Sequence, residues 1–258
     1  VEALNVRFLV DCGMVQGGRT AAARNHEPFP FDPAAIDFVL LTHAHIDHSG
    51  LLPKLTRAGF KGAIYATTAT VDLLGVMLPD SAHIQESDAK RNAQRLRGKD
   101  ALPPLYTLQD ASDCLQQARG VEYDREFAPR VGVRARFRDA GHILGSAIIE
   151  VWVTEYGYPT KLVFSGDLGQ PGRPILRDPT PIEDADILVI ESTYGNRQHK
   201  DFSATEEEMI GIVEKTLFER GGNVIVPAFA VGRTQEVLYH LHRLTSEGRL
   251  RQPRVFVD

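Results

Sequence analysis

Three histidines and an aspartate lie within six consecutive positions, and this run constrains the fold more than any other feature. The residues before it, Phe38 to Leu41, have the composition of a buried strand, and the run itself reads Thr-His-Ala-His-Ile-Asp-His-Ser-Gly over 42–50. Leucines then follow at helical spacing and lead to a helix end near Gly59. A connection between strand and helix that is so rich in imidazole and carboxylate groups is typical of a metal site.

The spacing within this run indicates two neighbouring metal positions. His43 and His45 are two residues apart in extended chain, so their side chains can point the same way. Asp47 and His48 lie at the start of the helix and face a second position nearby. The alternative is an incidental histidine-rich tract on the surface, which the density of ligand types in one short connection disfavours.

Two further candidate ligands come much later in the chain. His142 lies in a loop between Gly141 and Gly145, where low backbone bulk lets an imidazole approach a metal. Asp167 ends an apolar strand that begins at Leu162, and its carboxylate suits a ligand shared by two ions. Either residue taken alone is as readily an ordinary loop histidine or an ordinary aspartate at a strand end.

In this order, the motifs resemble those of the metallo-β-lactamase superfamily. The run at 42–50 is similar to the family's signature, and His142 and Asp167 match its third and fourth motifs. The resemblance implies two Zn²⁺ ions, the first held by His43, His45, His142 and Asp167, and the second by Asp47, His48 and Asp167. Asp11 follows the strand Val6 to Val10 and matches the first motif, a carboxylate that orients a ligand histidine and fixes its tautomer.

A second group of motifs resembles the β-CASP branch, the nucleases of this superfamily. Glu191 lies in Ile-Leu-Val-Ile-Glu-Ser-Thr-Tyr-Gly over 187–195, which is similar to motif A and is expected to begin as a buried strand. Residues 222–229 are expected to form a strand that leads into a turn and helix at 230–238, like the opening of the β-CASP cap domain. An ordinary strand-helix unit is the alternative for that segment. The glutamate with Ser-Thr-Tyr-Gly resembles the RNA-processing members rather than the DNA-repair members.

The resemblance therefore implies a zinc-dependent ribonuclease that hydrolyses RNA phosphodiester bonds with metal-activated water, in RNA processing or decay. Asp47, Glu191 and Asp11 are the expected catalytic residues. The expected partner is single-stranded RNA, and a homodimer is an open alternative. Two other functions stay open: a small-molecule hydrolase of the same fold, which Glu191 disfavours, and a non-catalytic scaffold subunit, which the intact ligand set disfavours.

The expected fold class is α+β, a four-layer αββα sandwich with the start of a Rossmann-like cap domain. Residues 1–197 would form the metallo-β-lactamase domain without its usual first hairpin, and 198–258 the truncated N-terminal part of the β-CASP domain. The family's later histidines have no counterpart, because His199, His240 and His242 lie in other contexts; His240 and His242 are expected to face solvent or pack between helices. We therefore expect a fragment, and whether the chain is active by itself stays open.

Three further predictions concern local structure. Thr70 is expected to cap a helix that runs through Met77, and Ser81 to Leu96 are expected to form a second, longer polar helix. Residues 131–138 alternate between apolar and polar side chains, which predicts a half-buried strand. Period-two spacing places Arg134, Arg136 and Arg138 on one face of that strand, where they could contact RNA phosphates; a solvated strand face is the more common explanation.

Composition excludes few function classes but fits a globular enzyme. With 258 residues, 43% of them hydrophobic, the chain can bury a sizeable core. The net charge of -5 disfavours a basic nucleic-acid tail, although two divalent ions would supply positive charge where a phosphate must bind. The two cysteines, Cys12 and Cys114, form no disulfide framework, and Cys12 is expected to be buried rather than a metal ligand. The sequence shows neither a signal peptide nor an apolar run long enough to span a membrane. A reducing cytoplasm is the expected compartment.

Overall fold

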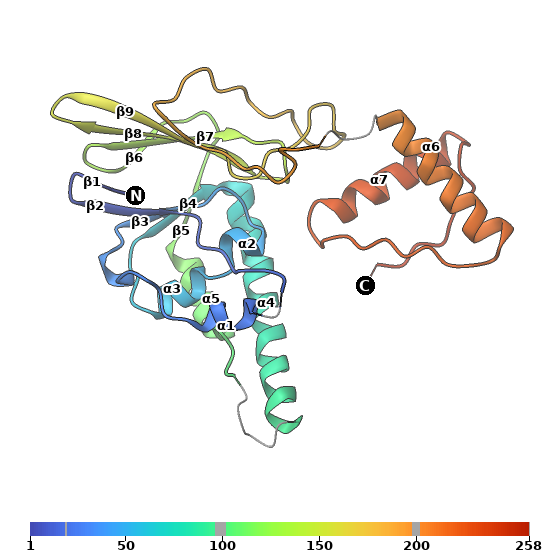
Figure 1. Ribbon diagram of the computed structural model, residues 1–258, viewed down its shortest axis with the longest axis horizontal. Coiled ribbons are helices and arrows are strands. Elements are labelled where there is room, and N and C mark those ends of the chain that lie inside the picture. Colours follow the sequence, from blue (N-terminus) through green and yellow to red (C-terminus); the bar gives the residue numbers. More distant parts are fainter. Residues whose placement is uncertain (19, 96–101, 198–201, 258) are drawn as a thin grey trace. The chain divides into compact units, whose positions relative to one another are not determined.

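The computed structural model describes residues 1–18, 20–95, 102–197 and 202–257 (Figure 1). The chain forms two compact units, Val1–Glu191 and Ser192–Asp258. The first and last residues of the predicted second domain, 198 and 258, lie outside the described ranges. His199 also lies outside them. No helix in the described ranges is both long enough and apolar enough to cross a membrane.

The first unit contains two five-stranded sheets. The first sheet has the order β1-β2-β3-β4-β5, with β1 at Glu2–Ala3, β2 at Val6–Val10, β3 at Phe38–Leu40, β4 at Ala63–Thr67 and β5 at Ala118–Val121. The second has the order β10-β9-β8-β7-β6, with β6 at Phe127–Arg130, β7 at Val133–Asp139, β8 at Ala147–Glu155, β9 at Tyr158–Phe164 and β10 at Ile187–Val189. Strands β2 to β5 are parallel, whereas β6 to β9 form an antiparallel meander to which β10 adds in parallel.

Helices cover the outer face of the first sheet (Figure 1). They are α1 at Ala21–His26, α2 at Ile46–Ser49, α3 at Leu52–Arg57, α4 at Thr68–Arg95 and α5 at Leu108–Gln117, and a short 3₁₀ turn lies at Pro33–Ala35. A second core lies between the sheets, where Phe8 stacks on Phe38 with ring centroids 4.9 Å apart and Phe137 is fully buried. The expected α+β sandwich of two sheets is confirmed. In the described residues of this unit, the helical layer lies on the first sheet only.

The prediction of two helices around Pro79 was wrong, because α4 continues through the proline as one helix of 28 residues. Proline removes a backbone donor and costs helix stability. However, Leu74, Leu78 and Ala82 all pack into the core beneath the first sheet, and this burial continues across the proline. Tertiary packing therefore outweighs the local preference. The predicted end at Leu96 lies outside the described residues.

The two apolar segments of the predicted β-CASP opening also differ from expectation. Strand β10 forms, but Ile187, Leu188 and Val189 are 50%, 54% and 53% exposed because β10 is an edge strand that pairs only with β9. The strand predicted at 222–229 is absent, and Ile225 is 89% exposed. A strand requires a hydrogen-bonding neighbour, and the described residues of the second unit contain no strand.

The second unit is a small helical assembly built from α6 at Phe202–Val213, a π-helical turn at Glu214–Glu219 and α7 at Arg233–Ser246. Its apolar core is formed by Val213, Leu244 and Leu250 with partly buried neighbours. The buried carboxylate of Glu206 on α6 pairs with His240 of α7 at 3.3 Å. His240 thus packs between helices and His242 is exposed, which confirms that prediction.

Candidate metal centre

The predicted ligands come together at one edge of the sandwich, where both sheets end. His43 and His45 follow β3, and His45 is the residue that precedes the first turn of α2. His142 lies in the loop between β7 and β8, and Asp167 follows β9. The two sheets are joined here by a backbone hydrogen bond of 2.8 Å from the Ala147 N–H to the Thr42 carbonyl.

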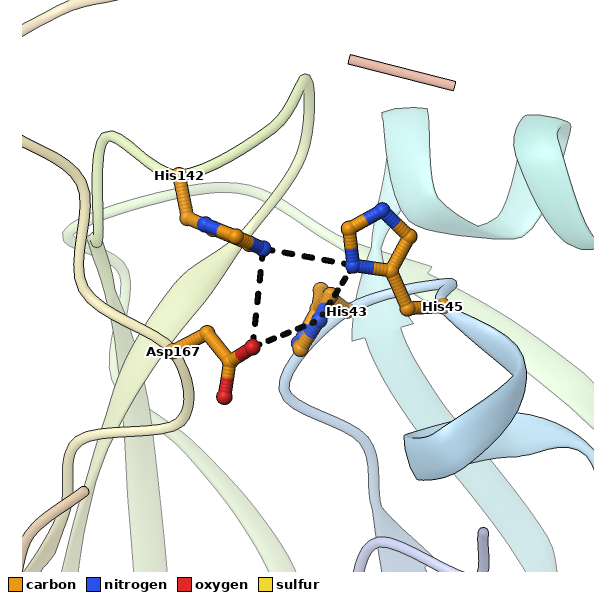
Figure 2. Close-up of side chains that lie close together, drawn as sticks. All are labelled: His43, His45, His142 and Asp167. Carbon is orange, nitrogen blue, oxygen red and sulfur yellow. Dashed lines mark hydrogen bonds and ion pairs between the residues drawn. The ribbon is translucent and has the colours of Figure 1, made fainter. Parts of the chain in front are cut away.

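Four side chains direct one atom each to a common point (Figure 2). The Nδ1 atom of His45 lies 3.1 Å from Nε2 of His43 and 3.2 Å from Nε2 of His142. The Oδ2 atom of Asp167 lies 3.6 Å from Nε2 of His142 and 3.9 Å from Nε2 of His43. All four atoms lie within 4.8 Å of one another. Tetrahedral zinc with bonds of about 2.0–2.2 Å separates its ligands by roughly 3.3–3.6 Å, and the four separations given above, 3.1–3.9 Å, lie around that range.

The other oxygen of Asp167 faces a second group. Its Oδ1 atom lies 3.2 Å from Nε2 of His48, and that nitrogen lies 4.0 Å from Oδ2 of Asp47. The Asp47 side chain is 49% exposed, whereas that of His48 is 19% exposed. The two oxygens of Asp167 therefore face different groups of side chains: Oδ2 faces His43 and His142, and Oδ1 faces His48.

The Asp11 carboxylate contacts both His48 and Thr42. Its Oδ2 atom lies 2.7 Å from Nδ1 of His48, and its two oxygens accept hydrogen bonds from the Thr42 N–H at 2.7 Å and the Thr42 hydroxyl at 2.8 Å. Nδ1 of His48 therefore donates to Asp11, which leaves Nε2 as the atom that faces Asp167. Asp11 adopts a positive φ of 64°, an uncommon conformation for a residue with a side chain.

Burial and charge set the protonation of these groups. Burial, with the neighbouring imidazoles of His48, His45 and His142, lowers the pKa of His43 to about 2, so His43 is neutral and its ring nitrogen can act as a ligand. Burial opposes the charged form of His48 too, but the hydrogen bonds to Asp11 and Asp167 prevail and raise its pKa to about 10. The hydrogen bond to His48 lowers the pKa of Asp167 to about 2. At neutral pH the ionised carboxylate of Asp167 is therefore paired with a protonated His48, while the buried His43 is neutral.

Glu191 lies beside the site and holds the loop that carries Asp167. Its Oε1 atom accepts a hydrogen bond of 2.8 Å from the Leu168 N–H, and its own N–H donates to the Ser165 hydroxyl at 3.0 Å. The contacts thus fix the residues on either side of Asp167. A catalytic role for Glu191 stays a prediction.

Thr42 contacts the candidate site but was not among the predicted site residues. Its hydroxyl donates to Asp11 and lies 3.0 Å from Nδ1 of His43, so one side chain connects a supporting carboxylate to a candidate ligand. The available signal was its position directly before His43 at the end of an apolar strand.

Gly13 allows a close approach between two backbone segments, because a Cβ there would lie 1.5 Å from the Asp47 carbonyl oxygen. Only glycine permits this close approach to α2.

The three arginines of β7 are paired with acidic side chains. Arg134 contacts Glu126 at 2.6 Å, Arg136 contacts Glu150 at 2.7 Å and Arg138 contacts Asp124 at 2.7 Å. Arg134 and Arg136 also stack over Trp152, with guanidinium carbons 5.4 and 5.2 Å from the ring centroid. These contacts favour a structural role on the strand face over phosphate binding.

Cys12 is buried as predicted and takes no part in the ligand set. Burial raises the pKa of its thiol to about 12. Cys114 is also a free, buried cysteine, and burial raises its pKa to about 12. Both side chains therefore behave as small apolar groups at neutral pH.

Comparison with known proteins finds a matching family model and several relatives. A family model described as the metallo-beta-lactamase superfamily matches residues 5–208. The chain is 40% identical over 98% of its length to a protein named ribonuclease TTHA0252 of Thermus thermophilus, of which it covers 52%. It is 31% identical to an RNase J-like protein and 30% identical to the transcription termination factor FttA of Methanocaldococcus jannaschii, with all of this chain aligned and 54% and 39% of those proteins covered. The chain thus spans about half the length, or less, of these relatives.

Proposed function

This chain belongs to the metallo-beta-lactamase superfamily, and we propose that it carries the metal-binding catalytic unit of a β-CASP ribonuclease. The observation that carries the proposal is the convergence of four ligand atoms on one point, with the second oxygen of Asp167 facing His48. The names of the relatives, which include a ribonuclease, an RNase J-like protein and a transcription termination factor, favour RNA as the substrate.

Two zinc ions are the proposed cofactors. The donor set supports zinc because neutral imidazole nitrogens and carboxylate oxygens are its usual ligands, and the spacing of the donors suits tetrahedral geometry. The first ion would be held by His43, His45, His142 and Asp167, and the second by Asp47, His48 and Asp167. When bound, the ions supply a water of lowered pKa and positive charge beside the phosphoryl group.

The surrounding residues have distinct proposed roles in this reaction. Asp11 holds one proton of His48 on Nδ1, so that the proton a cation would displace is the one on Nε2, the nitrogen that faces Asp167. Glu191 keeps the Asp167 loop in place through the Leu168 N–H. Asp47 is the most exposed of the carboxylates at the site, so it is the one that an incoming substrate or water reaches first. The roles of Asp11 and Glu191 are proton holding and orientation, which their hydrogen bonds can supply without rearrangement.

Single-stranded RNA is the proposed partner, and a homodimer stays an open proposal. Hydrolysis by a metal-activated water does not need the RNA 2′-hydroxyl, so the chemistry of the site alone does not separate RNA from DNA. A reducing cytoplasm is the proposed compartment, because both cysteines are free and buried.

The decisive experiment is an RNA cleavage assay with the protein expressed from its complete coding sequence. Metal content is measured first, and then fluorescent single-stranded RNA and DNA of one sequence are offered to wild type, His43→Ala and His83→Ala. His83 is an exposed histidine on α4 and serves as the matched control. We expect zinc in wild type, cleavage of RNA to products with a 5′-phosphate, and loss of cleavage in His43→Ala but not in His83→Ala.

The same experiment separates the alternatives. Intact RNA together with hydrolysis of thioester or lactone substrates by the zinc-loaded protein would replace the ribonuclease with a small-molecule hydrolase. A protein that binds no zinc and cleaves nothing would be a scaffold subunit. Equal cleavage by His43→Ala and wild type would show that the chemistry does not use this ligand set.

A further inference from the structure

The loop that carries His142 is closed by a side chain outside the ligand set. The Ser146 hydroxyl oxygen accepts hydrogen bonds from the N–H of His142 at 3.0 Å and from the N–H of Ile143 at 3.2 Å. The Ser146 N–H donates back to the Ile143 carbonyl at 3.0 Å. Ser146 is only 1% exposed, so water has little access to replace its hydroxyl. A single serine therefore holds the backbone of the candidate ligand itself.

The far end of the same loop is tied to distant parts of the fold. The Tyr123 hydroxyl donates to the Ser146 carbonyl at 2.8 Å. The hydroxyls of Thr67 and Thr70, where β4 ends and α4 begins, both donate to the Gly145 carbonyl at 2.6 and 2.9 Å. Gly145 has a φ of 84°, and a Cβ there would lie 2.6 Å from the Thr70 nitrogen. The loop is thus anchored to the first sheet and to the segment between β5 and β6.

We propose that Ser146 is a positioning residue for His142, with Tyr123 as its anchor. The inference rests on the metal site of the proposed function, but not on the reaction catalysed there. A turn flanked by glycines has many conformations, and ordering it only when metal binds would subtract from the binding free energy. The hydroxyl of Ser146 orders this turn during folding, so that Nε2 of His142 already lies 3.2 Å from Nδ1 of His45.

A purely structural role for Ser146 gives a different expectation. In that case its loss would lower the stability of the fold and leave the affinity of the folded protein for metal unchanged. Positioning instead predicts weaker metal binding and a changed coordination geometry at constant folding. Spectroscopy of bound Co²⁺ separates the two because its visible absorption depends on the ligand geometry.

The test compares Ser146→Ala, Tyr123→Phe and the control Ser81→Ala. Ser81 lies on α4, and its hydroxyl oxygen accepts a hydrogen bond from Tyr106 at 2.9 Å, so the control removes a comparable bond elsewhere in the same unit. Metal-free proteins are titrated with Co²⁺ and their thermal unfolding is recorded. We expect Ser146→Ala to bind Co²⁺ about 10- to 100-fold more weakly with an altered spectrum, the range usual for groups that orient a ligand. Tyr123→Phe should show a smaller change in the same direction, and Ser81→Ala none.

Wild-type affinity and spectrum in Ser146→Ala would overturn the proposal, as would an equal loss of affinity in Ser81→Ala. If Ser146→Ala does not fold, Tyr123→Phe decides by the same criteria, because it keeps the ring and removes only the hydroxyl. Wild type that binds Co²⁺ but, with zinc, leaves RNA intact would count against the proposed function and leave this inference standing. Wild type that binds no Co²⁺ would remove both.

Discussion

The ligands of residues 42–50 and the ligands of the two later loops reach the same point by different physical means. In the first region, backbone groups fix the start of α2, since the Cys12 N–H donates to the His48 carbonyl at 2.8 Å and the Met14 N–H to the Ile46 carbonyl at 3.0 Å, and the Asp11 carboxylate orients the His48 ring. In the later loops, side chains also bind the backbone beside the ligands: the Ser146 hydroxyl accepts from the His142 N–H, and the Glu191 carboxylate accepts from the Leu168 N–H next to Asp167. The first region thus depends on the path of neighbouring backbone, and the second on a few hydroxyl and carboxyl groups.

This difference teaches which substitutions the site can absorb. Backbone contacts persist through most changes of side chain, so the path of the first region should tolerate substitution outside the proposed ligands, Asp11 and close-approach glycines such as Gly13. In the His142 loop, by contrast, the single substitution Ser146→Ala removes the acceptor of two backbone N–H groups. The predictions below test this contrast, from the largest expected effect to the smallest.

Asp167→Ala should have the largest effect, because Asp167 contacts ligands of both regions. Its two oxygens lie 3.2 Å from Nε2 of His48 and 3.6 Å from Nε2 of His142. We expect the variant to lose both metal ions, as measured by elemental analysis of the purified protein. Asp88→Ala removes an exposed carboxylate on α4 and should retain wild-type metal content. Equal retention by the Asp167 variant would show that this carboxylate does not join the two regions.

Asp11→Ala should have a smaller effect, confined to the first region. The substitution leaves every proposed ligand in place but removes the acceptor that holds Nδ1 of His48 at 2.7 Å. Loss of such a partner weakens metal affinity about 10- to 100-fold. Zinc titration of the metal-free variant measures it, with Asp88→Ala again as control. A loss as complete as that of Asp167→Ala would mean that Asp11 is itself a ligand.

The triple change of Arg134, Arg136 and Arg138 to Gln should have the smallest effect on RNA binding. Each arginine contacts an acidic side chain, which leaves little positive charge for phosphate. The binding of a short single-stranded RNA is titrated across salt concentrations, where each lost phosphate contact lowers the slope by about 0.7. We expect the slopes of variant and wild type to agree. A slope lower by about two would extend the RNA-binding region along β7.

The sequence was most informative where the physics is local. The ligand run at 42–50 could be located because it lies directly between a strand and a helix. The apolar residues of that strand and helix are readable from the sequence alone. His142 and Asp167 could be named as candidates from their glycine and strand contexts. Their convergence with His45 depends on how two sheets pack, which no local pattern encodes.

The failures have the same physical origin. The helix α4 continues through Pro79 because Leu78 and Ala82 are buried by distant residues, a contribution that local propensity does not contain. The pairing of Arg136 with Glu150 depends on strand register, since the two residues are direct partners across β7 and β8. Ser146 was overlooked because its importance lies in where its hydroxyl points after the turn has formed.

One consequence of the site geometry concerns the order of events during folding. His45 and His142 are 97 residues apart in the chain, yet their ring nitrogens are 3.2 Å apart. Closing so long a loop is slow compared with forming a hairpin or a helix, so the complete ligand set arises only after both sheets have associated. Metal would then bind the finished fold far better than any partly folded chain. By mass action, a higher concentration of free metal would lower the unfolded fraction of the protein. A lower unfolded fraction would lengthen its survival in a cell.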